Sequence, residues 1–168
     1  MKHILNSSTL RTLYHSLIYP YLTYCIEIWG AASKFRTDPL LKLQKRCCKI
    51  ITNSHPRSPS LPLFQSLKIL PFASLHHYCV LLFMHRVHFR RLPKLVLSMF
   101  IPRNLILQIM TRQYNQLEIP KYKRQISCAT IAFTGVKLWN SIFLKIPYNC
   151  SHSSFKLKLR KYLFCNLN

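Results

Sequence analysis

The chain has 168 residues, which suits one domain or one domain with a small appendage, and 49% of them are hydrophobic, enough to fill a core. It carries 25 Lys and Arg against three acids, for a formal net charge of +22. Two-metal phosphoryl transfer, glycosidase chemistry and aspartic-protease chemistry need converging carboxylates, so we expect no catalysis from this chain alone.

The first predicted helix runs to Trp29, with Ser7 or Ser8 as its N-cap. Pro20 lacks a backbone N–H and is expected to kink it, and Gly30 is expected to end it. Its apolar residues recur at helical spacing.

The clearest amphipathic helix covers residues 38–53, capped by Thr37 or Asp38, with Pro39 in its first turn. A hydrophobic stripe is predicted, and the rest of the helix is basic. The pattern is also typical of calmodulin targets, membrane-surface helices and ordinary surface helices. The stripe comprises Leu40, Leu43, Cys47, Ile50 and Ile51, and the basic side comprises Lys42, Lys45, Arg46 and Lys49.

Three prolines predict a loop over residues 54–62, followed by a short helix at 63–69 and a longer one at 73–91. The longer helix carries four histidines without a neighbouring acid, which favours surface or base-stacking roles over metal ligation. These are His76, His77, His85 and His88.

The spacing of apolar residues changes after residue 111. There, β-branched and aromatic residues predict one or two short strands within 114–135. Gly135 is expected at a turn and Trp139 in the core. Ser151, Ser153 or Ser154 is expected to cap a last basic helix with a buried stripe at Phe155, Leu159, Tyr162 and Leu163. The fold class is therefore mainly α, with several amphipathic helices and a small β-containing segment near the C-terminal third.

The cationic excess predicts a polyanionic partner, because a compact domain with this charge repels itself. Nucleic acid is favoured, and an anionic membrane or an acidic protein remains open. Cations can hold phosphates while interleaved aromatic rings stack on unpaired bases. The candidate nucleic-acid-binding residues are Lys42, Lys45, Arg46, Lys49, Arg112, Lys121, Tyr122, Lys123, Arg124, Lys158 and Lys161.

Seven cysteines include no C-x-x-C pair, so we expect no zinc site and interpret them as buried free thiols. Two isolated glycines cannot build a phosphate-cradling loop, so no cofactor and no small-molecule substrate are expected. Neither a signal peptide nor a transmembrane segment is predicted, which favours an intracellular protein, nuclear or cytoplasmic.

Several segments, in order, resemble the region that follows the polymerase core in reverse transcriptases of non-LTR (LINE-type, Jockey-like) retrotransposons. They are LRTLYHSLIYPYLTYCIEIWG (10–30), LLKLQKRCCKIITNS (40–54), PLFQSLKILPFASLHHYCVLLFMHRV (62–87), Thr111-Arg112, FTGVKLWNSI (133–142) and FKLKLRKYLF (155–164). Two departures are Val136, where the family often has proline, and Ile142-Phe143, where it usually has Leu-Pro.

The resemblance implies a helical thumb-like region over 1–110 and a small mixed segment over 111–168. It implies a fragment of an RNA-directed DNA polymerase that holds RNA or an RNA/DNA duplex, with the missing polymerase core as a further partner. The catalytic aspartate motif of the family has no counterpart here, which favours a truncated element copy or a mispredicted gene. A cationic module for membranes or acidic proteins, and a non-functional relic, are the alternatives.

Overall fold

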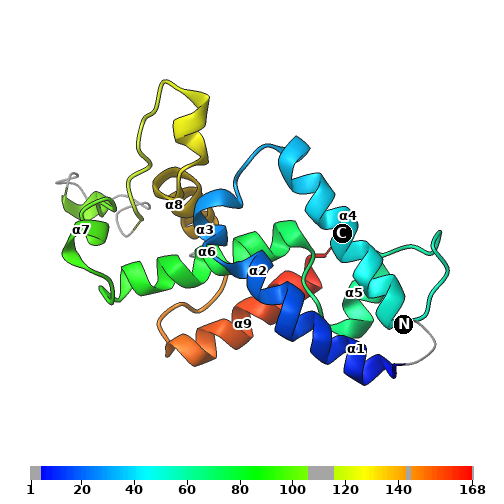
Figure 1. The fold of residues 1–168 in the computed structure, drawn as a ribbon. Helices are drawn as coiled ribbons and strands as arrows, with labels where there is room; N and C mark the ends of the chain where they lie inside the picture. Colours follow the sequence, from blue (N-terminus) through cyan, green and yellow to red (C-terminus); the bar gives the residue numbers. More distant parts are fainter. Residues whose placement is uncertain (1–4, 106–115, 143–144, 168) are drawn as a thin grey trace. The chain divides into compact units, whose positions relative to one another are not determined.

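The computed structural model describes residues 5–105, 116–142 and 145–167, and Figure 1 shows that helices dominate them. The predicted mainly α class is confirmed. The chain forms two compact units: unit 1 comprises Met1–His76 with Leu163–Asn168, and unit 2 comprises His77–Tyr162.

The N-terminal segment of unit 1 is a series of short helical pieces instead of one kinked helix. A π-helical turn directly precedes Pro20, where a wider turn accommodates a residue that has no N–H to donate. The break comes later, at Cys25, whose φ is 49°. Asn6, not Ser7 or Ser8, occupies the N-cap position. The pieces are α1 (Ser7–Leu13), η1 (Tyr14–Ile18), α2 (Tyr19–Thr23) and α3 (Ile26–Trp29).

The long basic helix, α4 (Lys34–Ile51), begins earlier than predicted, directly after Ser33. Pro39 therefore lies inside α4 and not in its first turn. Proline removes the hydrogen bond that its own N–H would donate and crowds the carbonyl four residues earlier, and here both effects fall near the start of an 18-residue helix. The helix can therefore continue through Pro39.

The buried face of α4 differs from the predicted stripe by about one residue. Gln44 is 1% exposed, whereas Leu43 is 58% exposed and Ile50 is also exposed. Nε2 of Gln44 donates to the hydroxyl of Tyr14 at 3.0 Å and to the carbonyl of Leu70 at 2.8 Å. These two bonds offset part of the cost of burying the amide, whose Oε1 has no hydrogen-bond partner among the described residues. The core around them comprises Tyr14, Cys48, Ile51, Phe64, Leu67 and Ile69.

Three helices end on left-handed residues other than glycine. Asn53, Lys68 and Arg90 have φ values of 50°, 54° and 51° after α4, α5 (Leu61–Leu67) and α6 (Phe72–His88). In each case the next N–H donates to the carbonyl five residues earlier, which is the Schellman arrangement. The pairs are Ser54 to Lys49, Ile69 to Phe64 and Arg91 to Arg86.

Unit 2 does not contain the strands expected within 114–135, as far as its described residues show. The β pairing there is one isolated bridge between Pro102 and Leu117. Residues 125–142 are mostly helical instead, and in α8 the buried apolar residues Ala132, Val136, Trp139 and Ile142 recur at intervals of three and four. The elements are α7 (Lys94–Leu97), η2 (Arg103–Leu105), η3 (Gln125–Ala129) and α8 (Ile131–Ile142).

Gly135 lies inside α8 and not at a turn. A Cβ there would lie 2.9 Å from Sδ of Met84, so the residue permits close approach of α8 to α6. Trp139, on the same helix, is 2% exposed, which confirms its predicted burial. Close packing, not backbone freedom, explains this glycine.

The last helix, α9 (His152–Cys165), follows the prediction. Ser151 precedes it, and its hydroxyl accepts a hydrogen bond from the N–H of Ser154 at 3.2 Å. Phe155, Leu159 and Leu163 are buried, and Tyr162 is half-buried. The predicted cap and most of the buried stripe are therefore confirmed.

Candidate nucleic-acid interface

The first candidate surface, the α4 surface, consists of Lys42, Lys45 and Arg46 on the outer side of α4. Lys42 and Arg46 are exposed and Lys45 is half-exposed. Lys49 has a different role, because its Nζ donates to the carbonyl of Pro56 and tethers the proline-rich loop to the helix. Three of the four predicted cations therefore remain available for phosphates.

The second candidate surface is the 121–124 segment, which leads into η3 and α8. All four of its residues, Lys121, Tyr122, Lys123 and Arg124, are exposed. The Tyr122 ring is 41% exposed, with its centroid 6.3 Å from that of Phe133. One ring among three cations suits a phosphate backbone with unpaired bases.

The third candidate surface is the α9 surface, formed by Lys158 and Lys161. Both residues are exposed, as is Lys156 on the same helix. They lie on the polar side of α9, away from the buried Phe155 and Leu159. Arg112, the remaining predicted residue, lies outside the described residues.

The predicted binding residues that the structure describes are divided between the two units. The α4 surface belongs to unit 1, and the other two belong to unit 2. Within unit 2, the 121–124 segment and α9 lie on opposite sides of α8 in Figure 1. Within unit 2, the 121–124 segment and the α9 surface are therefore two distinct basic surfaces.

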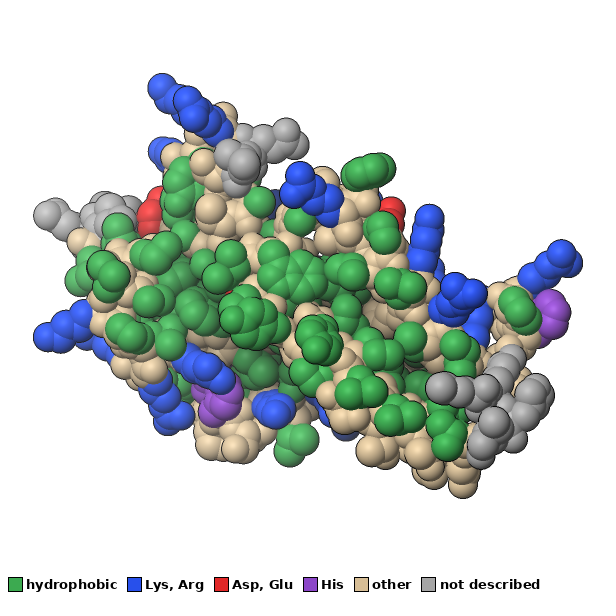
Figure 2. Space-filling view, viewed as in Figure 1, with side chains coloured by type: hydrophobic (Ala, Val, Ile, Leu, Met, Phe, Trp, Pro, Cys, Tyr) green, Lys and Arg blue, Asp and Glu red, His purple; other side chains and the backbone are tan. Residues whose placement is uncertain are grey.

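The three acidic residues are too few to neutralise the positive charge of these surfaces. Nε of Arg103 lies 2.8 Å from Oε2 of Glu118 in an ion pair. Even if every acid paired with a cation, 25 basic residues minus three acids would leave 22 positive charges. Figure 2 shows Lys and Arg side chains standing out from the surface with few acidic groups among them. Such a field attracts polyanions and weakens as salt is added.

Two of the four histidines on α6 are buried, which corrects their predicted surface role. His76 is buried in unit 1 and His85, 1% exposed, in unit 2, whereas His77 and His88 are exposed. His85 stacks on Phe155 with ring centroids 4.4 Å apart, and its Nδ1 lies 3.4 Å from Nδ1 of His152. A helical spacing of four from the buried Leu81 was the sequence signal for this position.

Burial is the main cause that lowers the pKa of His85, and the neighbouring His152 lowers it further. The pKa of His152 is lowered by desolvation and by Arg86, Arg91 and Lys156. Both effects favour neutral rings, so this pair adds no positive charge to the surface at neutral pH. Within the described ranges, no group of three His, Cys, Asp or Glu residues is arranged to hold a metal ion.

The cysteines are free thiols, but burial holds for only some of them. Cys48 is fully buried, and burial raises its pKa to about 12. Cys25 and Cys165 are exposed, and the others are half-buried. A thiol with a raised pKa is a weak nucleophile, so Cys48 acts as a small apolar side chain.

No single helix within the described ranges is long and apolar enough to cross a membrane. The pair α5 and α6, bent by 47°, is together long and apolar enough by length and composition.

Comparison of the chain with protein-family models, curated proteins and solved structures finds no match.

Proposed function

We propose that the chain binds nucleic acid, RNA or an RNA/DNA duplex, through its exposed Lys and Arg side chains. The observation that carries this proposal is the excess of exposed cations on the α4 surface and the 121–124 segment, in a chain with a net charge of +22. Binding releases counterions condensed on the phosphate backbone, so affinity falls steeply as salt is added.

We further propose that the chain is a fragment of a retrotransposon reverse transcriptase without its catalytic core. The ordered resemblance of six segments supports this origin, and the scarcity of carboxylates is consistent with a part that holds nucleic acid while chemistry occurs elsewhere. The missing polymerase core would then be its natural protein partner.

The proposal is tested by replacing Lys42, Lys45 and Arg46 together with Gln and measuring affinity for RNA and DNA over a range of salt. Each lost phosphate contact flattens the slope of log K against log salt by about 0.9 on B-form DNA and about 0.7 on a single strand. The triple variant should therefore flatten it by roughly two to three units.

The control changes three exposed cations of unit 1 outside the candidate surfaces: Arg11, Lys34 and Arg57. It removes the same charge but should change the slope less. Equal slopes for both triple variants would reject the α4 surface. Failure of the unaltered chain to bind either nucleic acid in dilute buffer would reject the function.

A second candidate function is binding to an anionic membrane or an acidic protein. The observation that favours it is a set of exposed apolar side chains among the cations of unit 1, such as Phe35 at 88% exposure with Lys34 and Arg36 beside it. Co-sedimentation with anionic vesicles, compared with RNA binding at the same ionic strength, separates the two functions.

The third alternative is that the chain is a non-functional relic of a mobile element. It is tested by searching the flanking genomic DNA for an upstream reading frame that encodes a polymerase.

A further inference from the structure

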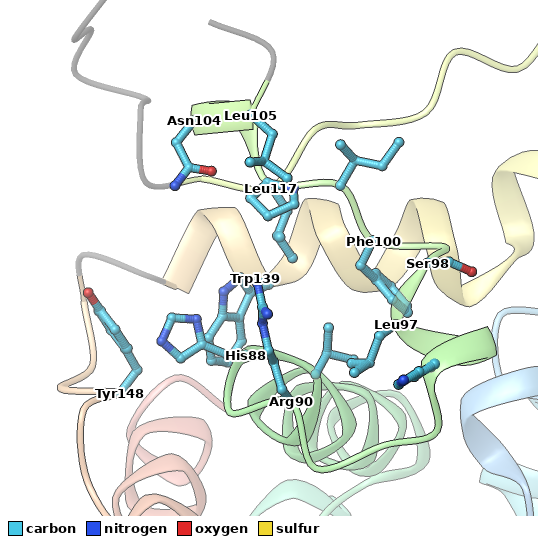
Figure 3. A pocket seen from close by; sticks show the side chains of 14 residues that line it. His88, Arg90, Leu97, Ser98, Phe100, Asn104, Leu105, Leu117, Trp139 and Tyr148 are labelled. Carbon is cyan, nitrogen blue, oxygen red and sulfur yellow. The ribbon is translucent and has the colours of Figure 1, made fainter.

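Unit 2 contains a cavity of about 770 Å³ between the end of α6, α7, η2 and α8. Figure 3 shows its wall divided by chemistry, with His88, Trp139 and Tyr148 on one side and Leu97 and Phe100 on the other. The volume lies within the range of about 300–1,000 Å³ that is usual for small-ligand sites. The cavity therefore suits a ligand with a flat apolar part.

Arg90 supplies the charge of this cavity. Its left-handed backbone ends α6, and Figure 3 shows its side chain rising from the helix end between the two walls. Lys94 also lines the cavity. Glu118, the one acidic residue in the sequence of unit 2, is paired with Arg103, so its charge is already partly neutralised. The positive charge of the cavity favours an anionic ligand.

The aromatic wall supplies a stacking surface. The centroid of the His88 ring lies 5.7 Å from that of Trp139 and 5.1 Å from that of Tyr148. His88 is the exposed member, since Trp139 is almost fully covered. Partial burial of the His88 ring lowers its pKa, which favours the neutral form with an uncharged aromatic face.

We propose that this cavity holds one unpaired nucleotide of the bound nucleic acid, with its base against His88 and its phosphate on Arg90. The inference rests on the proposed nucleic-acid-binding function and adds a preference to it. Bases in a duplex stack on each other, whereas an unpaired base has free faces that can stack on a protein ring. The chain should therefore bind single strands, or duplexes with an unpaired end, more tightly than blunt duplexes.

The test uses the full chain and fluorescence anisotropy with a ten-nucleotide RNA and a blunt duplex of the same length. Arg90→Gln should weaken single-strand binding roughly tenfold, the size expected for one charge-assisted contact, and change duplex binding by less than about twofold. Arg57→Gln, an exposed arginine of unit 1, is the matched control and should affect both ligands alike.

Stacking is tested separately at His88. His88→Ala should weaken single-strand binding, whereas His88→Phe, which keeps a flat ring, should preserve it. Circular dichroism checks that each variant remains helical. Adenosine 5′-monophosphate should compete with the single strand in the unaltered chain and not in Arg90→Gln.

Two outcomes would overturn the inference in distinguishable ways. If the chain binds nucleic acid but Arg90→Gln weakens single strand and duplex equally or not at all, the nucleotide site is wrong and the proposed function stands. If the chain binds neither ligand, both proposals fail together.

Discussion

At the scale of single residues, burial is decided by hydrogen-bond partners as well as by hydrophobicity. A pattern of apolar residues placed Gln44 outside the core of unit 1, and the structure places it inside. Its partners are the hydroxyl of Tyr14 and the carbonyl of Leu70, 30 and 26 residues away in sequence. No local pattern contains partners at that distance, which explains why the predicted stripe of α4 was wrong.

Gln44→Leu should destabilise the protein by about 1–3 kcal/mol, because two buried polar groups lose the donor that satisfies them. The measurement is the free energy of unfolding by urea. Gln65→Leu, an exposed glutamine on α5, makes the same chemical change and should alter stability by less than about 0.5 kcal/mol. Equal losses for the two variants would show that the amide bonds of Gln44 contribute nothing.

Gly30→Ala should also destabilise unit 1, by about 1–3 kcal/mol, because the new methyl group would overlap the ring of His76. Gly135→Ala is the comparison. There the methyl group meets the flexible side chain of Met84, and alanine favours a helix interior by about 0.5–1 kcal/mol. Thermal unfolding should rank Gly30→Ala as the more damaging change, and the reverse order would contradict the close approach at Gly30.

At the scale of elements, the cap and the stripe of α9 were predicted well, whereas the start, the cap and the stripe of α4 and the helical state of α8 were not. Ser151, Phe155 and Leu159 behave in α9 as their spacing predicts. In 114–135 the apolar residues fit both a strand and a helix, and Gly135 was interpreted as a turn. Packing of α8 on Met84 decides in favour of the helix, and this contact is invisible to a local pattern.

Ser151→Ala should destabilise α9 by about 0.5–2 kcal/mol, since the N–H of Ser154 loses the hydroxyl that caps it. Ser153→Ala, an exposed serine in the first turn of α9, is the matched control. Hydrogen exchange at the start of α9 should be faster in Ser151→Ala only. Identical exchange in both variants would rule out the cap.

At the scale of the whole molecule, the sequence predicted the helical class and the cationic surface, because both follow from composition and periodicity. It did not predict that Lys49 donates to the carbonyl of Pro56, because that contact depends on how the proline-rich loop packs on α4. The pairing of His85 with His152 also joins residues 67 positions apart. The residue types of the candidate surfaces were therefore predictable, and contacts between residues distant in the sequence were not.

Stability should fall as the pH is lowered from 7 to 5. The pKa of His85 is lowered in the folded state, so below the ordinary value of about 6.5 the unfolded chain binds protons that the folded chain refuses. The neutral, buried His85 therefore contributes its full stability above pH 6.5. That contribution is lost as the pH falls from 6.5 toward the lowered pKa of the folded state. His88 and His152, which have lowered pKa values and face the same cluster, add to the loss.

The measurement is the melting temperature as a function of pH. His85→Phe keeps the stacking on Phe155 and should flatten the dependence, whereas Gln65→Leu, at an exposed position of α5, replaces no titratable group and should leave it unchanged. A melting temperature that stays level between pH 7 and pH 5 in the unaltered chain would contradict the buried, neutral state of His85.

The left-handed residues Lys68 and Arg90 at the helix ends are positions where glycine could stabilise the protein. A residue with a Cβ pays roughly 1–2 kcal/mol for that backbone conformation, which glycine adopts freely. The same two side chains place positive charge beside the carbonyl ends of α5 and α6, which recovers part of that energy. Lys68→Gly is therefore the first substitution to try when a more stable protein is needed. Arg90 is the less suitable position, because glycine there would remove the cation from the cavity in unit 2.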